Sequence, residues 1–256
     1  MTDPEHAASR KPIAGKVALI TGGARRLGAV IAHALHEAGA NVVLHYRSSA
    51  EAARTLAGEL NEARAGSAVL AHCDLLDTAS LERLARTAAT AFGRLDILVN
   101  NASTFYPTPM GEIGEQAWDD LIGTNLKAPL FLAQAAAPAL HENGGLILNL
   151  VDIHGMRPLR RHPVYSIAKA GLIMLTKSLA RELGPQVRVN AIAPGPVMWP
   201  EAGVDELLRK RIIDRTALKR GGSPEDVARA ALYFACDAPF VTGQVLAVDG
   251  GRSVGW

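Results

Sequence analysis

Tyr165 and Lys169 are the two residues of this sequence whose types and spacing are best suited to moving a proton. Side chains spaced i, i+4 share one face of a helix, and the surrounding residues predict a helix over 163–183. A free phenol has a pKa of about 10, and a nearby ammonium favours the phenolate and lowers that pKa. The pair can therefore give a proton to a substrate and recover it. Taken alone, the same spacing is more often a feature of an ordinary helix surface.

A glycine-rich segment, TGGARRLG at residues 21–28, is suited to binding an anion. It follows an apolar segment typical of a strand and opens a helical one, and the backbone N–H groups at a helix N-terminus favour negative charge. Gly22 and Gly28 allow a tight turn and a close approach of ligand and helix. The order strand, turn, helix and second strand indicates a phosphate-binding turn, and an ordinary glycine-rich connection is the alternative.

Both motifs lie in a regular alternation of short apolar and longer helical segments. Strands are predicted at residues 17–21, 41–46, 67–74, 95–101, 145–151, 186–193 and 243–250. Helices are predicted at about 27–39, 49–64, 78–92, 115–140, 163–183 and 224–236. Strands that are apolar on both faces and alternate with helices indicate a parallel sheet covered on both sides. We therefore expect an α/β fold, a single doubly wound (Rossmann-type) domain with a seven-stranded parallel sheet.

The segments outside this alternation define the domain limits. Residues 1–14 are expected to form a flexible N-terminal tail, and residues 15–256 the folded domain. The stretch 195–222 is rich in proline and then in charge. It is too long for an ordinary connection, and loops of that length are often lids over a site.

Composition excludes several classes of protein. The chain has 256 residues with 27 basic and 25 acidic side chains, a balance that argues against a nucleic-acid partner. Two cysteines, Cys73 and Cys236, and the absence of a zinc-binding pattern predict neither a disulfide framework nor a metal site. No apolar stretch reaches about 18 residues, so no membrane span is expected. The polar first dozen residues lack a signal-peptide pattern, and we expect a cytoplasmic protein.

The motifs together resemble the short-chain dehydrogenase/reductase family over about residues 15–251. The family pattern Thr-Gly-x-x-x-Gly-x-Gly matches the glycine-rich turn, apart from its middle glycine. The other marks are Asn100-Asn101-Ala102 after the fourth strand, Asn125 in the next helix, Tyr165 and Lys169, and Pro194-Gly195 after the sixth strand.

Two departures narrow the resemblance to the pteridine reductases, a subgroup that reduces pterins and folates. Arg26 replaces the middle glycine of the turn, and Asp152 replaces the usual catalytic serine. The run from Asn101 to Pro109 is also similar to that subgroup. There an aromatic residue, at position Phe105 here, stacks on the pterin ring.

NADPH is the expected cofactor. An acidic residue after the second strand would bind the ribose hydroxyls of NAD, but the sequence there has Tyr46, Arg47 and Ser48. Arg47 can meet a 2′-phosphate with its planar fork, although a solvated loop arginine is the plain alternative. Asp74 resembles the family residue that contacts the adenine, or it is a helix cap. The expected cofactor-binding residues are Gly22, Arg25, Arg26, Leu27, Gly28, Tyr46, Arg47, Ser48, Asp74, Asn101, Ala102, Ser103, Tyr165, Lys169, Pro194 and Gly195.

The resemblance implies that Tyr165, Lys169, Asp152 and Asn125 are catalytic. An ionised Asp152 accepts hydrogen bonds and cannot donate one to a ketone as serine does, but a pterin offers ring N–H and amino donors. A cap of the loop at 152–155 is the alternative role of Asp152, and a core position that of Phe105. Trp199 either closes over the pocket or packs within the protein. The expected substrate-binding residues are Arg26, Ser103, Phe105, Asp152, Tyr165 and Trp199.

We therefore expect NADPH-dependent reduction of a ring C=N bond in a pterin or folate substrate. The alternatives are a short-chain carbonyl reductase of another small substrate and a non-catalytic, cofactor-bound regulator. The resemblance further implies a homotetramer formed through the helices at about 115–140 and 163–183.

Overall fold

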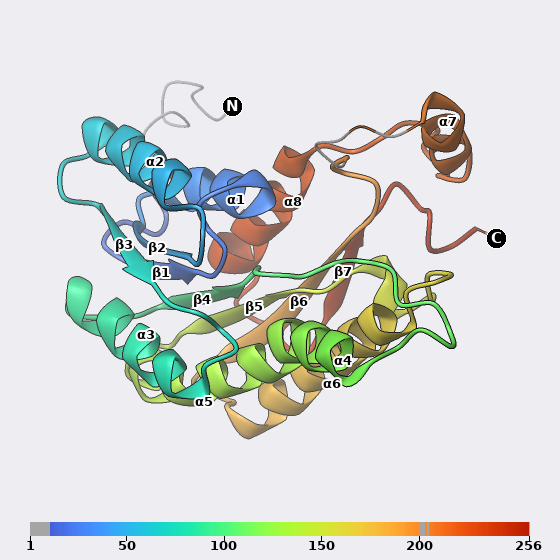
Figure 1. Cartoon of the computed structure of the whole chain (residues 1–256). Helices are drawn as coiled ribbons and strands as arrows, with labels where there is room; N and C mark the ends of the chain where they lie inside the picture. Colours follow the sequence, from blue (N-terminus) through green and yellow to red (C-terminus); the bar gives the residue numbers. More distant parts are fainter. Residues whose placement is uncertain (1–10, 200–202, 204, 256) are drawn as a thin grey trace, which may run out of the picture.

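The computed structural model describes residues 11–199, 203 and 205–255. Seven parallel strands form one sheet in the order β3-β2-β1-β4-β5-β6-β7 (Figure 1). The strands are β1 (Val17–Ile20), β2 (Asn41–Tyr46), β3 (Ala68–His72), β4 (Ile97–Asn100), β5 (Leu146–Leu150), β6 (Arg188–Pro194) and β7 (Val245–Val248). The strand order reverses between β1 and β4, where an α/β sheet leaves a crevice at the carboxyl ends of its strands. The predicted fold class and strand number are confirmed.

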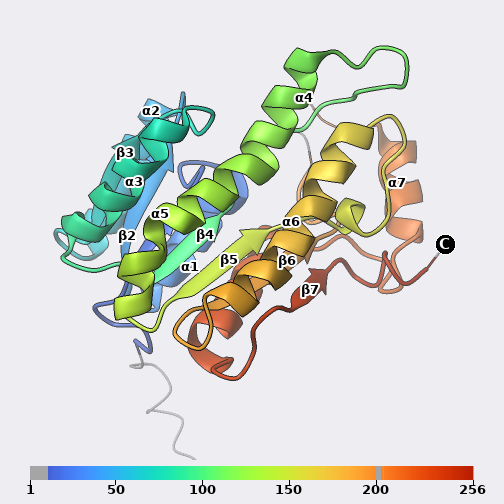
Figure 2. The same ribbon diagram turned by 90° about the horizontal axis from the view of Figure 1, so that it is seen from below.

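Helices cover both faces of the sheet, as expected (Figures 1 and 2). One layer contains α1 (Arg26–Glu37), α2 (Ala50–Ala63) and α8 (Pro224–Leu232). The other contains α3 (Thr78–Ala91), α4 (Glu115–Ile122), α5 (Ala128–Glu142) and α6 (Pro163–Glu182). Within the layers α1 packs against α8, α3 against α5 and α4 against α6.

Local signals explain where several helices begin and end. The Asp77 carboxylate accepts a hydrogen bond from the Ala79 N–H and caps α3. A capping box formed by Ser223 and Asp226 begins α8. Gly39, with a φ of +106°, follows the end of α1, in a conformation that glycine adopts at little cost.

The helix predicted at 115–140 contains an irregularity. A π-helical segment, Gly123–Lys127, joins α4 to α5, and Asn125 lies within it. Single π-turns inside α-helices are frequent at functional sites. Sequence periodicity did not reveal the segment, because one extra residue in a turn shifts the apolar pattern only slightly.

A buried polar chain ties the centre of the sheet to α6. The Asn100 amide donates to Asn149 Oδ1 at 2.8 Å, and the Asn149 amide donates to Thr176 Oγ1 at 2.9 Å. All three side chains are buried. Buried polar groups are costly unless paired, so this chain fixes β4 and β5 against the helix that carries Tyr165 and Lys169.

The predicted limits of the tail and the lid need correction. Residues 1–10 lie outside the described part of the chain, but residues 11–14 form a turn on the domain. Ile13 is only 2% exposed, and its N–H donates to the Ala38 carbonyl oxygen at 3.2 Å. The loop at 195–222 contains a helix, α7 (Glu206–Asp214), which the sequence analysis did not predict.

The charged sequence of α7 explains why it was missed. None of its residues is buried, so no apolar stripe against a core marks it in the sequence. Its start does carry a signal, because the Asp205 carboxylate accepts from the Leu208 N–H. Among the residues that the structure describes, no helix is long and apolar enough to cross a membrane.

Candidate active site

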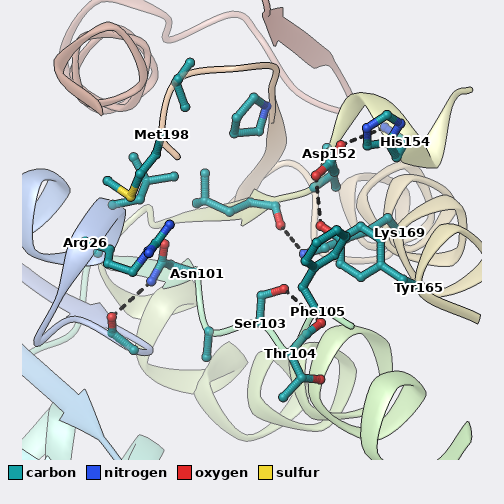
Figure 3. Close-up of a pocket in the computed structure, with 18 of the residues that line it drawn as sticks. Arg26, Asn101, Ser103, Thr104, Phe105, Asp152, His154, Tyr165, Lys169 and Met198 are labelled. Carbon is teal, nitrogen blue, oxygen red and sulfur yellow. Dashed lines mark hydrogen bonds between the residues drawn. The ribbon is translucent and has the colours of Figure 1, made fainter. Parts of the chain in front are cut away.

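A cavity of about 1420 Å³ opens at the carboxyl ends of the central strands, where the strand order reverses (Figure 3). It contains every predicted site residue except Asn125. The predicted residues that line it are Gly22, Arg25, Arg26, Leu27, Gly28, Tyr46, Arg47, Ser48, Asp74, Asn101, Ala102, Ser103, Phe105, Asp152, Tyr165, Lys169, Pro194, Gly195 and Trp199.

The glycine-rich turn is held between its neighbours by close contacts. Gly22 has a φ of +60°. A Cβ atom added at Gly28 would lie 2.3 Å from the Gly22 carbonyl oxygen and 2.6 Å from the Asn101 side-chain nitrogen. The Asn101 amide donates to the carbonyl oxygens of Thr21 and Gly22 at 2.8 and 3.1 Å. Only glycine fits at position 28, because the start of α1 packs directly on the Gly22 carbonyl and the Asn101 side chain.

Arg26 adopts a backbone conformation that is ordinarily found in glycine. Its φ is +53°, in the left-handed region, which costs a residue with a side chain roughly 1–2 kcal/mol. Its guanidinium donates to the Trp199 carbonyl oxygen at 3.3 Å, so the turn is connected to the loop after β6. The strained position therefore places a cation over the cavity, where a glycine would leave none.

His45 supports the same turn from below, a role that the sequence analysis missed. Its Nδ1 accepts from the Gly22 N–H at 3.1 Å, and its Nε2 contacts the Cys73 carbonyl oxygen at 3.2 Å. Burial lowers the pKa of His45 to about 4, so the ring is neutral. Neutral imidazole supplies the acceptor and the donor that these two contacts require. A polar residue inside an apolar strand was the available signal.

The end of β2 carries no carboxylate. Arg47 and Ser48 are exposed there and line the cavity together with Tyr46. The Arg47 carbonyl oxygen contacts His72 Nε2 at 3.0 Å, which fixes the loop that carries Arg47. Asp74 lines the same wall, and it is not a helix cap, because Asp77 caps α3.

The reacting centre joins Tyr165 to Asp152. The Tyr165 hydroxyl donates to Asp152 Oδ2 at 2.8 Å, and Asp152 Oδ1 accepts from the His154 N–H at 2.7 Å (Figure 3). Asp152 therefore both caps the loop at 152–155 and contacts the phenol, the two roles that the sequence left open. One oxygen caps the short 3₁₀ segment Ile153–Gly155, and the other faces the phenol.

The expectation that the Tyr165 pKa is lowered is wrong for this structure. Burial raises the pKa of the phenol well above its ordinary value. The charge and the hydrogen bond of Asp152 raise it further, while Ser103 opposes them. A nearby anion disfavours a phenolate, as burial does. Tyr165 is consequently a neutral phenol that holds a proton inside the cavity.

Lys169 lies one helical turn after Tyr165, as predicted, but its ammonium does not bond the phenol. Its Nζ donates to the Leu150 carbonyl oxygen at 2.9 Å and lies 5.6 Å from the centre of the Tyr165 ring. The side chain is 2% exposed. Burial lowers the pKa of Lys169 to about 8, against the opposing effect of the Asp152 charge. The ammonium is thus fixed between β5 and α6.

Phe105 is not a core residue. It is 55% exposed and lines the cavity. One face of its ring stacks on His162, with 4.7 Å between centroids and 8° between planes, and Tyr165 meets it edge-on at 4.8 Å. These contacts fix the ring as a flat apolar wall beside the phenol (Figure 3).

Asn125 supports the segment that carries Phe105 from the side away from the cavity. It is fully buried, and its Oδ1 accepts from the Ser103 hydroxyl at 2.6 Å. Its amide donates to the carbonyl oxygens of Thr104 and Leu121 at 3.0 and 2.9 Å. It therefore positions the segment that carries Ser103 and Phe105 and does not itself reach the cavity.

The loop after β6 and α7 form the outer wall. Trp199 lines the cavity, and the Arg209 guanidinium lies 5.4 Å from the centre of its ring. Gly195 permits a close approach here, because an added Cβ would lie 2.6 Å from Asp249 Cβ. Arg211, Arg215 and Arg252 also line the cavity and were not predicted. Their signal in the sequence was only a charged stretch and one arginine near the C-terminus.

Comparisons with known proteins show which family the chain belongs to. A family model described as enoyl-(acyl carrier protein) reductase matches residues 22–253. Pteridine reductase 1 of Leishmania tarentolae is 37% identical, over 93% of this chain and 96% of its own length. The chain belongs to the short-chain dehydrogenase/reductase family.

Other relatives in the family are not named as pteridine reductases. An uncharacterised oxidoreductase of Mycobacterium tuberculosis is 39% identical over 92% of this chain and 91% of its own length. A 3-oxoacyl-(acyl-carrier-protein) reductase of Staphylococcus aureus is 36% identical over 92% and 97%. The chain is thus an oxidoreductase of a family whose members bind NAD or NADP and act on small molecules.

Proposed function

We propose that this protein is an NADPH-dependent reductase of pterin-type substrates, which reduces a ring C=N bond of a dihydropterin or dihydrofolate. The observation that carries the proposal is the hydrogen bond of 2.8 Å between Tyr165 and Asp152 inside the cavity. It places a proton donor and an acceptor side by side, next to the flat wall of Phe105. The similarity to Pteridine reductase 1 supports the same activity.

Asp152 suits a pterin better than a ketone. A carboxylate has about four lone-pair sites, of which the His154 N–H and the Tyr165 hydroxyl use one each. The remaining sites accept hydrogen bonds from ring N–H and amino groups. A ketone oxygen has no proton to offer, so it would meet an acceptor where it needs a donor.

The chain fits NADPH at the opposite end of the cavity. The glycine-rich turn lines the cavity, Gly28 lets it pack tightly against the start of α1, and the backbone N–H groups there favour a pyrophosphate. Arg47 and Ser48 would meet a 2′-phosphate, since an arginine fork matches phosphate oxygens. When bound, NADPH supplies the hydride for the C=N carbon.

The protein groups manage the accompanying proton. Reduction of a C=N bond adds a hydride at carbon and a proton at nitrogen. Tyr165 keeps its proton at neutral pH because burial and Asp152 raise its pKa. The phenol can donate that proton to the ring nitrogen, directly or through Asp152, and the resulting phenolate regains a proton from solvent by way of the carboxylate. Lys169, fixed by Leu150, holds positive charge beside the developing phenolate.

Phe105 would orient the substrate. Its exposed ring offers a stacking surface for a flat heteroaromatic system, while His162 supports its other side. Stacking of a base on an aromatic side chain contributes about 1–3 kcal/mol. Ser103, held by Asn125, adds a hydroxyl at the edge of the same surface.

Carbonyl reduction is the second candidate, because the relative from Staphylococcus aureus is named as a 3-oxoacyl-(acyl-carrier-protein) reductase. The two candidates separate in one assay. The purified protein is mixed with NADPH and, in turn, a dihydropterin, dihydrofolate and a 3-oxoacyl thioester, and the loss of the reduced-nicotinamide absorbance is followed. We expect turnover with the pterins. Reduction of the thioester but of neither pterin would overturn the proposal. If none of the three substrates is reduced, a cofactor-bound regulator is favoured.

A further inference from the structure

We propose that Arg211, Arg215 and Arg252 form a second anion site, which selects pterins whose side chain ends in a carboxylate or a phosphate. This inference rests on the proposed pterin reductase function and deepens it. The three arginines line the cavity, but they do not belong to the glycine-rich turn or to the end of β2, where the cofactor phosphates are expected.

One of the arginines, Arg211, lies on α7, and Arg215 is the C-cap residue at its end. Leu208, Arg211, Ile212 and Arg215 line the cavity, with the spacing i, i+3, i+4, i+7 of a single helix face. No residue of α7 is buried, so this face is not packed against a core. It presents alternating apolar and basic side chains to the cavity, a surface suited to an apolar tail that ends in an anion.

Arg252 lies in the segment after β7 and lines the same side of the cavity. The C-terminal segment after β7 lies beside α7 in both Figures 1 and 2. The Arg252 guanidinium donates to the Ile212 carbonyl oxygen at 2.9 Å, and the Leu218 N–H donates to the Gly250 carbonyl oxygen at 3.1 Å. These bonds hold Arg252 under the basic face of α7.

The three arginines line the same cavity as the reacting Asp152 and Tyr165. Burial lowers the pKa of Arg252, and Arg215 lowers it further, whereas Asp249 and Asp152 raise it. The charges of Arg215 and Asp152 thus both act on Arg252. A pterin ring held at Asp152 would extend its side chain toward these cations.

The acidic groups nearby do not neutralise the wall. Both carboxylate oxygens of Asp249 accept backbone N–H groups, from Gly251 and Ser253. Asp152 is engaged by Tyr165 and His154. Within the described part of the chain, no acidic side chain forms an ion pair with Arg211 or Arg215. The wall keeps a surplus of positive charge, which an anionic ligand would balance.

The test compares substrates that share the pterin ring and differ in the tail. The wild-type protein is assayed with NADPH and three compounds: dihydrobiopterin, with a neutral tail, dihydrofolate, with two tail carboxylates, and a dihydroneopterin phosphate. We expect a higher kcat/KM for an anionic compound than for the neutral one. The preferred anionic compound identifies the carboxylate or the phosphate as the natural group.

The variant Arg211→Gln/Arg215→Gln then removes the charge of the α7 face. We expect the KM for the preferred anionic pterin to rise roughly tenfold with little change in kcat, because tail binding is equal in the ground and transition states. The neutral pterin should change less than about twofold, which also shows that α7 is intact. Higher salt should reduce the preference of the wild type, since Arg211 and Arg215 are exposed.

Two controls keep the result specific. Lys210→Gln removes one charge from the same helix outside the cavity lining and should leave both kinetic constants unchanged. Arg211→Lys/Arg215→Lys keeps the charge and should retain most of the preference. An equal effect of the glutamine variant on neutral and anionic pterins would overturn the anion site while the reductase function stands. Failure of the wild type to reduce any pterin would instead overturn the proposed function itself.

Discussion

The Tyr165 hydroxyl donates a hydrogen bond of 2.8 Å to Asp152, whose other oxygen is fixed by the His154 N–H. Together with burial, this contact raises the pKa of the phenol instead of lowering it. The protein therefore stores a proton at the reacting centre, which suits a reductase. The ammonium of Lys169, held by Leu150, is available to balance charge once that proton has left.

The first prediction concerns the cofactor. Arg47→Asp should lower the preference for NADPH over NADH by roughly tenfold to a hundredfold in kcat/KM, because a charge-assisted contact contributes about 1.5–3 kcal/mol. Steady-state kinetics with both cofactors measure this preference. Arg54→Asp, an exposed change on α2 outside the cavity, is the matched control. An unchanged preference in Arg47→Asp would show that the 2′-phosphate is bound elsewhere.

The second prediction concerns the stacking wall. Phe105→Ala should raise the KM for pterins about fivefold to a hundredfold with a smaller effect on kcat, because stacking acts in both ground and transition states. Met110→Ala, in the same connection and 83% exposed, should have no effect. A large loss of kcat at constant KM would instead give Phe105 a part in the chemical step.

The third prediction concerns stability and pH. The folded state lowers the pKa of Lys169 from 10.5 to about 8, so the unfolded chain binds more protons between these values. The buried ammonium costs stability below pH 8, and that cost is relieved as the pH rises. Between pH 8 and 9.5 the free energy of unfolding of the wild type should rise by about 2 kcal/mol relative to Lys169→Met.

Urea denaturation of the two proteins across that range measures this difference. Lys169→Met should be inactive and, at pH 7, no less stable than the wild type, since it removes a buried charge. Parallel stability curves for the two proteins would contradict the assigned cost of the ammonium.

The fourth prediction concerns assembly. Trp118, Ile167 and Met174 are 44%, 51% and 63% exposed on α4 and α6, which pack side by side. Large apolar side chains gathered on one helix layer favour an interface. We expect light scattering at micromolar concentration to give about four times the chain mass of 27.0 kDa. A mass of one chain would contradict this expectation.

The sequence was sufficient for the sheet, because each strand is a short apolar run between helical segments. The order of the motifs also located the turn and Tyr165, whereas Asp152 and Phe105 were predicted from the resemblance to the pteridine reductases. Contacts between residues far apart in the chain could not be predicted from the sequence. His45 under the turn, Asn125 behind Ser103 and Arg252 beside Ile212 depend on contacts between distant segments.

Two other outcomes show why local rules fail at this site. The i, i+4 spacing correctly placed Lys169 beside Tyr165, but the sign of the phenol pKa depends on Asp152 and on burial, which spacing does not contain. The helix α7 has no buried face, so its sequence lacks the apolar period by which helices are recognised.

Exchange of Asp152 for serine is the most direct test of the central claim. The kcat for a dihydropterin and for a simple ketone is measured with NADPH in the wild type and in Asp152→Ser, and both proteins are checked for equal thermal stability. We expect the wild type to reduce the pterin and not the ketone. The variant should lose about a hundredfold in pterin kcat, because it lacks the acceptor that shares the Tyr165 proton, and it should gain ketone reduction through the serine donor. Ready reduction of the ketone by the wild type, with no pterin turnover, would contradict the proposal.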